Sequence, residues 1–303
     1  MDHFADQLAA AVRRTGNSVC VGLDPRAKHL PPGMLNDHEH AAAAAVAYIK
    51  FCYEVLDVVA PLVPVVKVQA AFFEELGFTG MFSMNAAIDY AHSKGLLVIV
   101  DAKRNDIGST AEAYARGYLG REAAAWHADA LTVSPYLGDD SLTPFVDVAL
   151  ERGAGIFVLV KTSNPGGRFL QDVGCDQGPI YRRVAKHVEG LAAATASDCG
   201  YGAVGAVVGA TYPEQLVELR RDMPHTWFLV PGYGSQGGKA ADAAAAFDER
   251  GLGAIVNNSR GIIFAHERPE YARFRADNWQ GAVEAATLAM IEDLAAVVPR
   301  PRE

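Results

Sequence analysis

Short apolar runs alternate with helical patterns along most of the 303-residue chain, and this alternation restricts the possible folds more than any other feature. Each run has the length and composition of a strand that is buried on both faces. Helical periodicity of apolar residues fills the segments between the runs. The predicted strands are 18–22, 64–69, 96–100, 130–134, 155–160, 203–208, 226–230 and 253–256. The clearest predicted helices are 41–60, 83–94, 179–196 and 213–221.

Eight such strand–helix units, with no linker-like stretch between them, predict a closed α/β fold, the (β/α)8 TIM barrel. An open, doubly wound sheet is the competing architecture, because it uses the same alternation. Barrels of this kind commonly fill about 250 residues as one domain. We therefore expect a single domain over residues 1–303, with an N-terminal helix at 4–12 and a C-terminal helical extension at 283–296.

The charge and hydropathy of the chain argue against two classes of partner. The formal net charge is −9, and the lysines and arginines are scattered, whereas binding to a nucleic acid backbone requires concentrated positive charge. No apolar run approaches the roughly 20 residues that span a membrane. The N-terminal segment lacks the basic start and apolar core of a signal peptide. We expect no nucleic acid partner, no membrane association and a cytoplasmic location.

Neither the cysteines nor the histidines are spaced as metal ligands. The four cysteines lie far apart without a Cys-x-x-Cys pair, which is typical of buried thiols in a reducing compartment. The nine histidines show no ligand spacing, and His38 and His40 lie in a polar connector where we expect them to be solvated. The sequence therefore predicts no metal site.

Charged residues appear where the predicted strand at 96–100 ends. Side chains two positions apart on a strand point the same way, so Asp101 and Lys103 should stand side by side, and Asp106 follows. Lys67 interrupts another apolar strand, and a buried lysine normally needs an anionic partner. Neighbouring opposite charges often form only a surface turn. Here they directly follow a fully apolar strand in an α/β pattern, which favours a functional site.

The carboxyl ends of all barrel strands meet at one mouth, where the active sites of such barrels lie. Polar residues follow the predicted strands at that end. They are Asp24, Lys67, Asp101, Lys103, Ser134, Gln236 and Arg260. A fixed carboxylate such as Asp101 would destabilise a substrate carboxylate beside it, and Lys103 could stabilise the negative charge that forms and deliver a proton. The C-terminal extension is expected to pack outside this site.

Two turns near the C-terminus have the features of a phosphate site. A glycine-rich segment at 231–238 follows the seventh predicted strand, and Ser259, Arg260 and Gly261 follow the eighth. Barrels often bind phosphate at these two positions through backbone amides and a cation. The glycine-rich turn alone is a weak signal, but together with Arg260 it predicts a phosphorylated small-molecule substrate. Tyr233 could cover the ligand or lie on the surface.

Several of these residues also have an ordinary structural explanation. Asp24 and Ser134, each before a proline, could be turn formers. Lys67 could be only a counter-ion, which would still place it in the site. Thr110 could be a helix N-cap, and Arg260 could form a surface salt bridge.

Six motifs occur in a characteristic order along residues 18–263. They are Val-Gly-Leu-Asp-Pro at 21–25, Val-Lys-Val at 66–68, Asp-Ala-Lys-Arg-Asn-Asp-Ile-Gly-Ser-Thr at 101–110, Thr-Val-Ser-Pro-Tyr-Leu-Gly at 132–138, Pro-Gly-Tyr-Gly-Ser-Gln-Gly-Gly at 231–238 and Ser-Arg-Gly at 259–261. In this order the chain resembles the orotidine 5'-phosphate decarboxylase family, and most closely its longer-chain bacterial subgroup. The order is more specific than any one motif.

This resemblance implies a cofactor-free decarboxylation of orotidine 5'-monophosphate to UMP, the last step of de novo pyrimidine nucleotide synthesis. It implies that Lys103 protonates the carbanion left at pyrimidine carbon 6 and that Asp101 crowds the departing carboxylate. By the same resemblance Asp24 and Lys67 hold ribose hydroxyls, and Lys67 also pairs with Asp101.

Further matched positions imply contacts with the base and the phosphate. Ser134 would contact the pyrimidine edge, and Gln236 and Arg260 would bind the phosphate. The loop around Gln236 would close over the site and exclude water. The chain departs from shorter family members at 162–178, where it carries an extended loop that contains Thr-Ser-Asn-Pro-Gly-Gly. The sequence leaves the contribution of this loop open.

The resemblance also implies a homodimer with shared active sites. Asp106, Ile107 and Thr110 would then reach into the site of the neighbouring subunit. The expected ligands are orotidine 5'-monophosphate and UMP.

Two other functions fit parts of the pattern. Magnesium-dependent sugar-phosphate lyases and epimerases share the barrel and an Asp-x-Lys-x-x-Asp strand, but typically carry an acidic metal ligand where this chain has Lys67. A non-catalytic nucleotide-binding barrel would be expected to lack Asp101 or Lys103 and to keep Arg260, whereas this chain has all three. A magnesium requirement would favour the first alternative, and failure to consume orotidylate the second.

Overall fold

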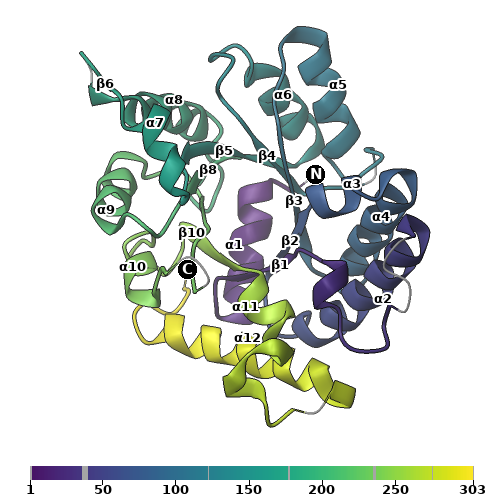
Figure 1. Ribbon diagram of the computed structural model, residues 1–303. Coiled ribbons are helices and arrows are strands. Elements are labelled where there is room, and N and C mark those ends of the chain that lie inside the picture. Colours follow the sequence, from purple (N-terminus) through teal and green to yellow (C-terminus); the bar gives the residue numbers. More distant parts are fainter. Residues whose placement is uncertain are drawn as a thin grey trace.

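Eight parallel strands form a closed barrel in the computed structural model, and helices surround it (Figure 1). The structure describes residues 2–35, 40–121, 123–176, 178–234, 237–274 and 276–302. The barrel strands are β1 (Val19–Leu23), β2 (Val65–Gln69), β3 (Leu97–Arg104), β4 (Ala130–Val133), β5 (Gly155–Lys161), β8 (Val204–Val208), β9 (Phe228–Val230) and β10 (Ala254–Asn258). They are hydrogen-bonded in the order β1-β10-β9-β8-β5-β4-β3-β2, and β2 closes the ring on β1. The predicted barrel is confirmed, and the open sheet is excluded.

Helices connect the strands around the barrel. They are α1 (Phe4–Thr15), α2 (Ala41–Val59), α3 (Ala71–Glu74), α4 (Gly77–Ser93), α5 (Gly108–Tyr118), α6 (Thr143–Arg152), α7 (Arg168–Gln171), α8 (Ile180–Ala194), α9 (Pro213–Asp222), α10 (Ala240–Ala244), α11 (Arg260–Ile263) and α12 (Trp279–Ala295). Short 3-10 turns lie at Ala27–His29, Pro165–Gly167, Ala265–Glu267, Pro269–Tyr271 and Ala276–Asn278. In the described ranges, none of the helices combines the length and hydropathy that a membrane span requires.

The extended segment at 162–178 follows β5 and lies outside the barrel. It contains α7 and β6 (Gly174–Cys175), and β6 pairs in antiparallel fashion with β7 (Gly178–Pro179). Figure 1 shows this hairpin projecting beside α8. The segment is therefore an addition to the eight-unit barrel rather than one of its strands.

Two hydrophobic clusters lie on the two sides of the barrel wall. Successive side chains of a strand point to opposite faces, so each strand contributes to both clusters. In β3, Leu97 and Ile99 pack inside the barrel, and Val98 and Val100 pack against the outer helices. The next inward position after Ile99 is Asp101. The alternation therefore places this carboxylate inside the mouth, above the apolar interior.

Helix α1 closes the N-terminal end of the barrel, and its buried side chains belong to the interior cluster (Figure 1). Phe4 packs edge-on against Phe157 of β5, with ring centroids 6.0 Å apart. Gly155 permits this approach, because a Cβ atom there would lie 2.2 Å from the Phe4 ring. The barrel interior is thereby sealed at the end opposite Asp101.

Some predicted boundaries differ from the structure. Helix α4 begins at Gly77 rather than at residue 83, because Gly80 lies against the backbone of Phe73 in a contact too close for any larger residue. Helix α5 begins at Gly108 with Ile107 as its N-cap residue, so the alternative that Thr110 caps this helix is wrong.

Truncation of Phe4 should destabilise the fold, because it opens a cavity at the sealed end of the barrel. Phe-to-Ala substitutions at buried positions typically lower the free energy of unfolding by about 3–5 kcal/mol. We expect Phe4→Ala to lower the urea midpoint, measured by tryptophan fluorescence. Phe169→Ala is the matched control, because Phe169 is exposed. An equal loss in both variants would contradict the role assigned to α1.

Candidate active site

Four charged side chains of alternating sign form a row at the C-terminal mouth of the barrel. They are Asp24, Lys67, Asp101 and Lys103, from the ends of β1, β2 and β3. Lys67 Nζ lies 3.1 Å from Asp101 Oδ2 and 3.8 Å from Asp24 Oδ1. Lys103 Nζ lies 2.6 Å from Asp101 Oδ1. The predictions that Asp101 and Lys103 stand side by side and that Lys67 has an anionic partner are confirmed.

Asp101 also accepts hydrogen bonds from uncharged side chains. Gln69 Nε2 donates to Asp101 Oδ2 at 3.0 Å, and Thr132 Oγ1 donates to Asp101 Oδ1 at 2.9 Å. The Thr132 hydroxyl in turn accepts from the backbone N–H of Lys103 at 2.9 Å. Charge-assisted hydrogen bonds of this kind are the strong ones, and together they fix the orientation of the carboxylate.

The members of the row stabilise one another's charges. Burial by itself would raise the pKa of Asp101, but the ammonium groups of Lys67 and Lys103 outweigh it and hold the pKa well below its usual range. Burial would likewise lower the pKa of Lys67, but the carboxylates of Asp101 and Asp24 outweigh it and raise the pKa above its usual range. Both Asp101 and Lys67 are therefore charged at neutral pH.

Lys103 differs from Lys67 in exposure and in backbone conformation. The Lys103 side chain is 48% exposed, whereas that of Lys67 is 5% exposed. Lys103 has a φ angle of 45°, which few residues other than glycine adopt, and the pairing of β3 with β4 shifts register between Val100 and Arg104. Such irregularities redirect side chains next to active sites. Here the Lys103 ammonium meets Asp101 and stays accessible from the mouth.

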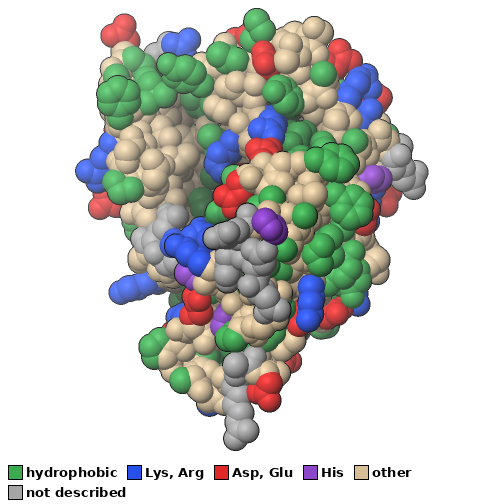
Figure 2. Space-filling model, turned by 45° about the vertical axis from the view of Figure 1, so that its right-hand side comes forward, with side chains coloured by type: hydrophobic (Ala, Val, Ile, Leu, Met, Phe, Trp, Pro, Cys, Tyr) green, Lys and Arg blue, Asp and Glu red, His purple; other side chains and the backbone are tan. Residues whose placement is uncertain are grey.

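The charged row forms one end of a cavity of about 300 Å³. Tyr233 from the segment after β9, Asn258 from the end of β10 and Arg260 from the segment after β10 also line it. The loop after β5 contributes Thr162, Ser163 and Asn164. Figure 2 shows a hollow beside which Lys, Arg, Asp and Glu side chains gather. One cavity thus brings the paired lysines and carboxylates together with an arginine, as a small-molecule site requires.

The segment after β10 builds the arginine part of the lining. Asn258 Oδ1 accepts from the N–H of Gly261 at 3.2 Å, at the start of α11, whose first residue is Arg260. Tyr233, whose position the sequence left open, lines the cavity, and its hydroxyl donates to Asp293 Oδ2 at 2.7 Å. Asp293 belongs to α12, none of whose residues is among those that line this cavity. The C-terminal helix thus packs outside the site, as predicted, and supports it through this contact.

Ser134, which was predicted to read the pyrimidine, does not line this cavity among the described residues. It follows β4, and its N–H donates to the carbonyl of Arg104. Gln236 lies outside the described residues, as does His38, while His40 is described and exposed. The roles predicted for Ser134 and Gln236 stay predictions.

Asp106, Ile107 and Thr110 also lie away from the lining of the cavity. Asp106 Oδ1 accepts from the N–H of Ile107 at 2.9 Å, and the side chains of Ile107 and Thr110 are exposed. Within this chain Asp24 stands in the row and Asp106 does not. The role predicted for Asp106 in the site of a neighbouring subunit stays a prediction.

Four polar strand residues that line the cavity were not predicted from the sequence, namely Gln69, Thr132, Asn257 and Asn258. Thr132 and Asn258 are buried. Each of the four lies in a strand that is otherwise mostly apolar, the same signal that identified Lys67. That signal could have found them.

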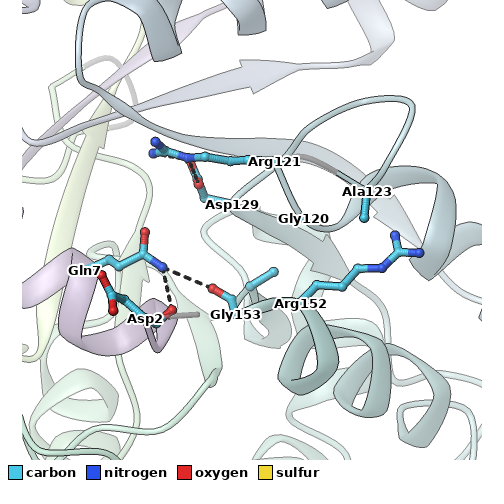
Figure 3. Close-up of a pocket in the computed structure, with 9 residues that line it drawn as sticks. Asp2, Gln7, Gly120, Arg121, Ala123, Asp129, Arg152 and Gly153 are labelled. Carbon is cyan, nitrogen blue, oxygen red and sulfur yellow. Dashed lines mark hydrogen bonds and ion pairs between the residues drawn. The ribbon is translucent and has the colours of Figure 1, made fainter.

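A second hollow, of about 210 Å³, lies at the N-terminal end of the barrel (Figure 3). Gln7 of α1 donates there to the carbonyls of Asp2 and Gly153, and Arg121 pairs with Asp129. These contacts join α1 and the segments that precede β4 and β5. They explain the hollow as part of the seal at the closed end, far from the charged row.

The four cysteines are unpaired thiols, three of them buried and Cys175 exposed. Within the described part of the chain, no group of three or more His, Cys, Asp or Glu side chains is placed to hold a metal ion.

Residues 17–274 match a family model described as the orotidine 5'-phosphate decarboxylase / HUMPS family. The chain belongs to this family. The matched region contains all eight barrel strands and every residue of the charged row.

Named relatives resemble the chain over almost its whole length. The orotidine 5'-phosphate decarboxylase of Rhodopirellula baltica is 57% identical over 298 residues, which are 96% of this chain and 98% of the relative. The same-named protein of Clostridium botulinum (strain Loch Maree) is 37% identical over 264 residues, 87% of this chain and 90% of the relative. The solved structure of Leishmania donovani OMP decarboxylase aligns with a TM-score of 0.75 at 32% identity, over 97% of this chain and 98% of that one. The resemblance inferred from the motifs is confirmed.

Acid should remove the stability that Asp101 gives to the fold. Its folded pKa lies below the ordinary value of 3.8, so the stabilisation is complete above that value and is lost as the pH falls through the folded pKa. We expect Asp101→Asn to lower the urea midpoint at about pH 6, and the difference from wild type to shrink below about pH 4. Asp147→Asn, at an exposed position on α6, should show neither effect. A difference for Asp101→Asn that is constant with pH would contradict the assigned ionisation.

Proposed function

We propose that this chain decarboxylates orotidine 5'-monophosphate to UMP without a cofactor, as the last step of de novo pyrimidine nucleotide synthesis. The observation that carries the proposal is the row of Asp24, Lys67, Asp101 and Lys103 in the same cavity as Arg260. Family membership and the names of the relatives support it. The unpaired cysteines fit a reducing compartment, and we place the activity in the cytoplasm.

The proposed chemistry uses the two ends of the charged row differently. The bond between pyrimidine carbon 6 and its carboxylate breaks, CO₂ leaves, and the electron pair stays on carbon 6. The Lys103 ammonium then transfers a proton to carbon 6, and solvent reprotonates the amine, since this side chain is half exposed. Asp101 disfavours the substrate carboxylate beside it, while Lys103 stabilises the carbanion.

Charge repulsion alone would not account for the reaction. Two charges about 4 Å apart at an effective dielectric constant near 20 interact by roughly 4 kcal/mol. Enzymes lower activation barriers by roughly 8–23 kcal/mol. The remainder must come from binding energy at distant groups, for which Arg260 and the proposed phosphate contact of Gln236 are the candidates.

The remaining contacts of the substrate follow from the lining of the cavity. Asp24 and Lys67 are proposed to hold the ribose hydroxyls. Besides the predicted Ser134, the loop after β5 offers Ser163 and Asn164 as polar groups for the pyrimidine edge, because both line the cavity.

We further propose a homodimer in which Asp106, Ile107 and Thr110 enter the partner's site. Ile107 is 56% exposed, and the segments that follow β2, β3 and β4 carry further large exposed apolar residues. They are Phe78, Phe82, Tyr114, Tyr136 and Leu137. Figure 2 shows large hydrophobic side chains on the face that comes forward from the side of Figure 1 where α4 lies. An exposed apolar rim of this extent is typical of a protein–protein interface.

Replacing the proposed proton donor should abolish turnover without unfolding the protein. General acid catalysis contributes about 10²–10⁴ to a rate, so we expect Lys103→Ala to lower kcat by at least about a hundredfold. The loss of orotidylate absorbance measures turnover, and circular dichroism checks the fold. Lys50→Ala, an exposed lysine on α2, is the control. Wild-type turnover in Lys103→Ala would refute the assignment.

The same assay on EDTA-treated wild-type protein separates this function from that of a magnesium-dependent sugar-phosphate lyase. We expect full activity after EDTA treatment. A loss that magnesium restores would favour the lyase.

Mixing two inactive variants should restore activity if the sites are shared. In a mixed dimer of Asp106→Asn and Arg260→Ala subunits, one site would carry both substitutions and the other neither. Random exchange then predicts about a quarter of wild-type activity, measured by orotidylate consumption. Native mass spectrometry confirms the exchange. If mixed dimers form and stay inactive, the shared-site arrangement is refuted.

A further inference from the structure

A larger cavity, of about 800 Å³, adjoins the active-site cavity on the side of Arg260. Arg26, Tyr233, Asn258 and Arg260 line both cavities and form the boundary between them. The outer cavity is therefore continuous with the part of the site to which we assign the substrate phosphate.

The lining of the outer cavity is positively charged, although the chain as a whole carries a net charge of −9. Its cationic residues are Arg26, Lys28, Lys239, Arg260 and Arg268, and its acidic residues are Glu267 and Asp293. The two carboxylates already have partners, because Glu267 lies 2.9 Å from His29 Nδ1 and Asp293 accepts from the Tyr233 hydroxyl. Of the five cations, Arg268 also has a partner, because it pairs with Glu270, which does not line the cavity. Cationic side chains still outnumber the acidic ones in the lining.

Arg26 lines both cavities. Its guanidinium lies over the Phe72 ring, 4.6 Å from the centroid. Its Nε is buried, and within the described residues this atom has no hydrogen-bond partner. A buried donor without an acceptor is unfavourable, so the position favours an anionic ligand. Lys28 and Lys239, which also line the outer cavity, are both exposed.

We propose that the outer cavity binds the second and third phosphates of a nucleoside 5'-diphosphate or triphosphate whose first phosphate occupies the position of the substrate phosphate near Arg260. This inference rests on the proposed function, which places the nucleoside 5'-phosphate in the inner cavity. Uridine nucleotides would bind in competition with orotidine 5'-monophosphate. Later products of pyrimidine nucleotide synthesis would then restrain the enzyme at its own active site.

The alternative use of this charge is to steer the substrate toward the site without retaining any ligand. Steering would change the association rate and its salt dependence. It would not make a diphosphate bind more tightly than a monophosphate. Relative affinities therefore distinguish the two.

Calorimetry with UMP, UDP and UTP, in EDTA and at constant ionic strength, tests the proposal. Exposed ion pairs each contribute a factor of up to about five, so we expect UDP and UTP to bind about tenfold more tightly than UMP. In Lys28→Ala/Lys239→Ala we expect this gain to fall to about twofold or less while UMP affinity is unchanged. Lys50→Ala/Lys186→Ala removes the same charge from α2 and α8, and it should keep the full gain.

Equal affinities of UMP, UDP and UTP for the wild-type protein would overturn this inference while leaving the proposed function intact. A gain that survives in Lys28→Ala/Lys239→Ala, or that is lost equally in the control, would also overturn it. Failure of UMP itself to bind would overturn the proposed function, and this inference with it.

Discussion

The structure depends on one carboxylate, that of Asp101, held between two ammonium groups inside the mouth of a barrel. A buried carboxylate that loses its partner destabilises a protein by several kcal/mol, so Asp101 requires Lys67 and Lys103. In the free protein the two carboxylates and two ammonium groups of the row compensate one another. A substrate carboxylate beside Asp101 adds a charge without compensation. Its departure as CO₂ removes that charge, and the carbanion that remains lies in the field of Lys103.

The barrel supplies the precision that this arrangement needs. Neighbouring parallel strands fix the relative height of their side chains, and the register that pairs Gln69 with Asp101 sets the amide next to the carboxylate. Lys67 lies one inward position below Gln69 and reaches Asp101 from the apolar interior. The seal formed by α1 keeps the other end closed. Rigid strands on a packed interior therefore position the charges, while the loops above them supply the contacts that distinguish substrates.

The sequence was sufficient where a local rule decides the outcome. Period-two alternation placed Asp101 and Lys103 together, and the rarity of a lysine in an apolar strand identified Lys67. The sequence was insufficient where contacts between segments far apart in the chain decide the outcome. The hydrogen bond from Thr132 to Asp101 depends on the register of β3 against β4, which shifts between Val100 and Arg104. No local sequence pattern predicts this shift.

Contacts between distant segments also determine how the loop after β5 contributes to the cavity lining. Its position is held by the buried Lys161, which pairs with Asp172 at 2.5 Å, and by Gln171, which donates to the Thr162 hydroxyl. These contacts bring Ser163 and Asn164 to the cavity. The sequence left the contribution of this loop open, because such long-range contacts cannot be recognised from a local pattern.

A crystal structure with UMP bound would test the central claim most directly. The account predicts that carbon 6 of the pyrimidine faces Lys103 Nζ, with the space for a carboxylate on carbon 6 next to Asp101 and the phosphate near Arg260. A base bound with carbon 6 turned away from Lys103, or a nucleotide bound outside this cavity, would contradict it.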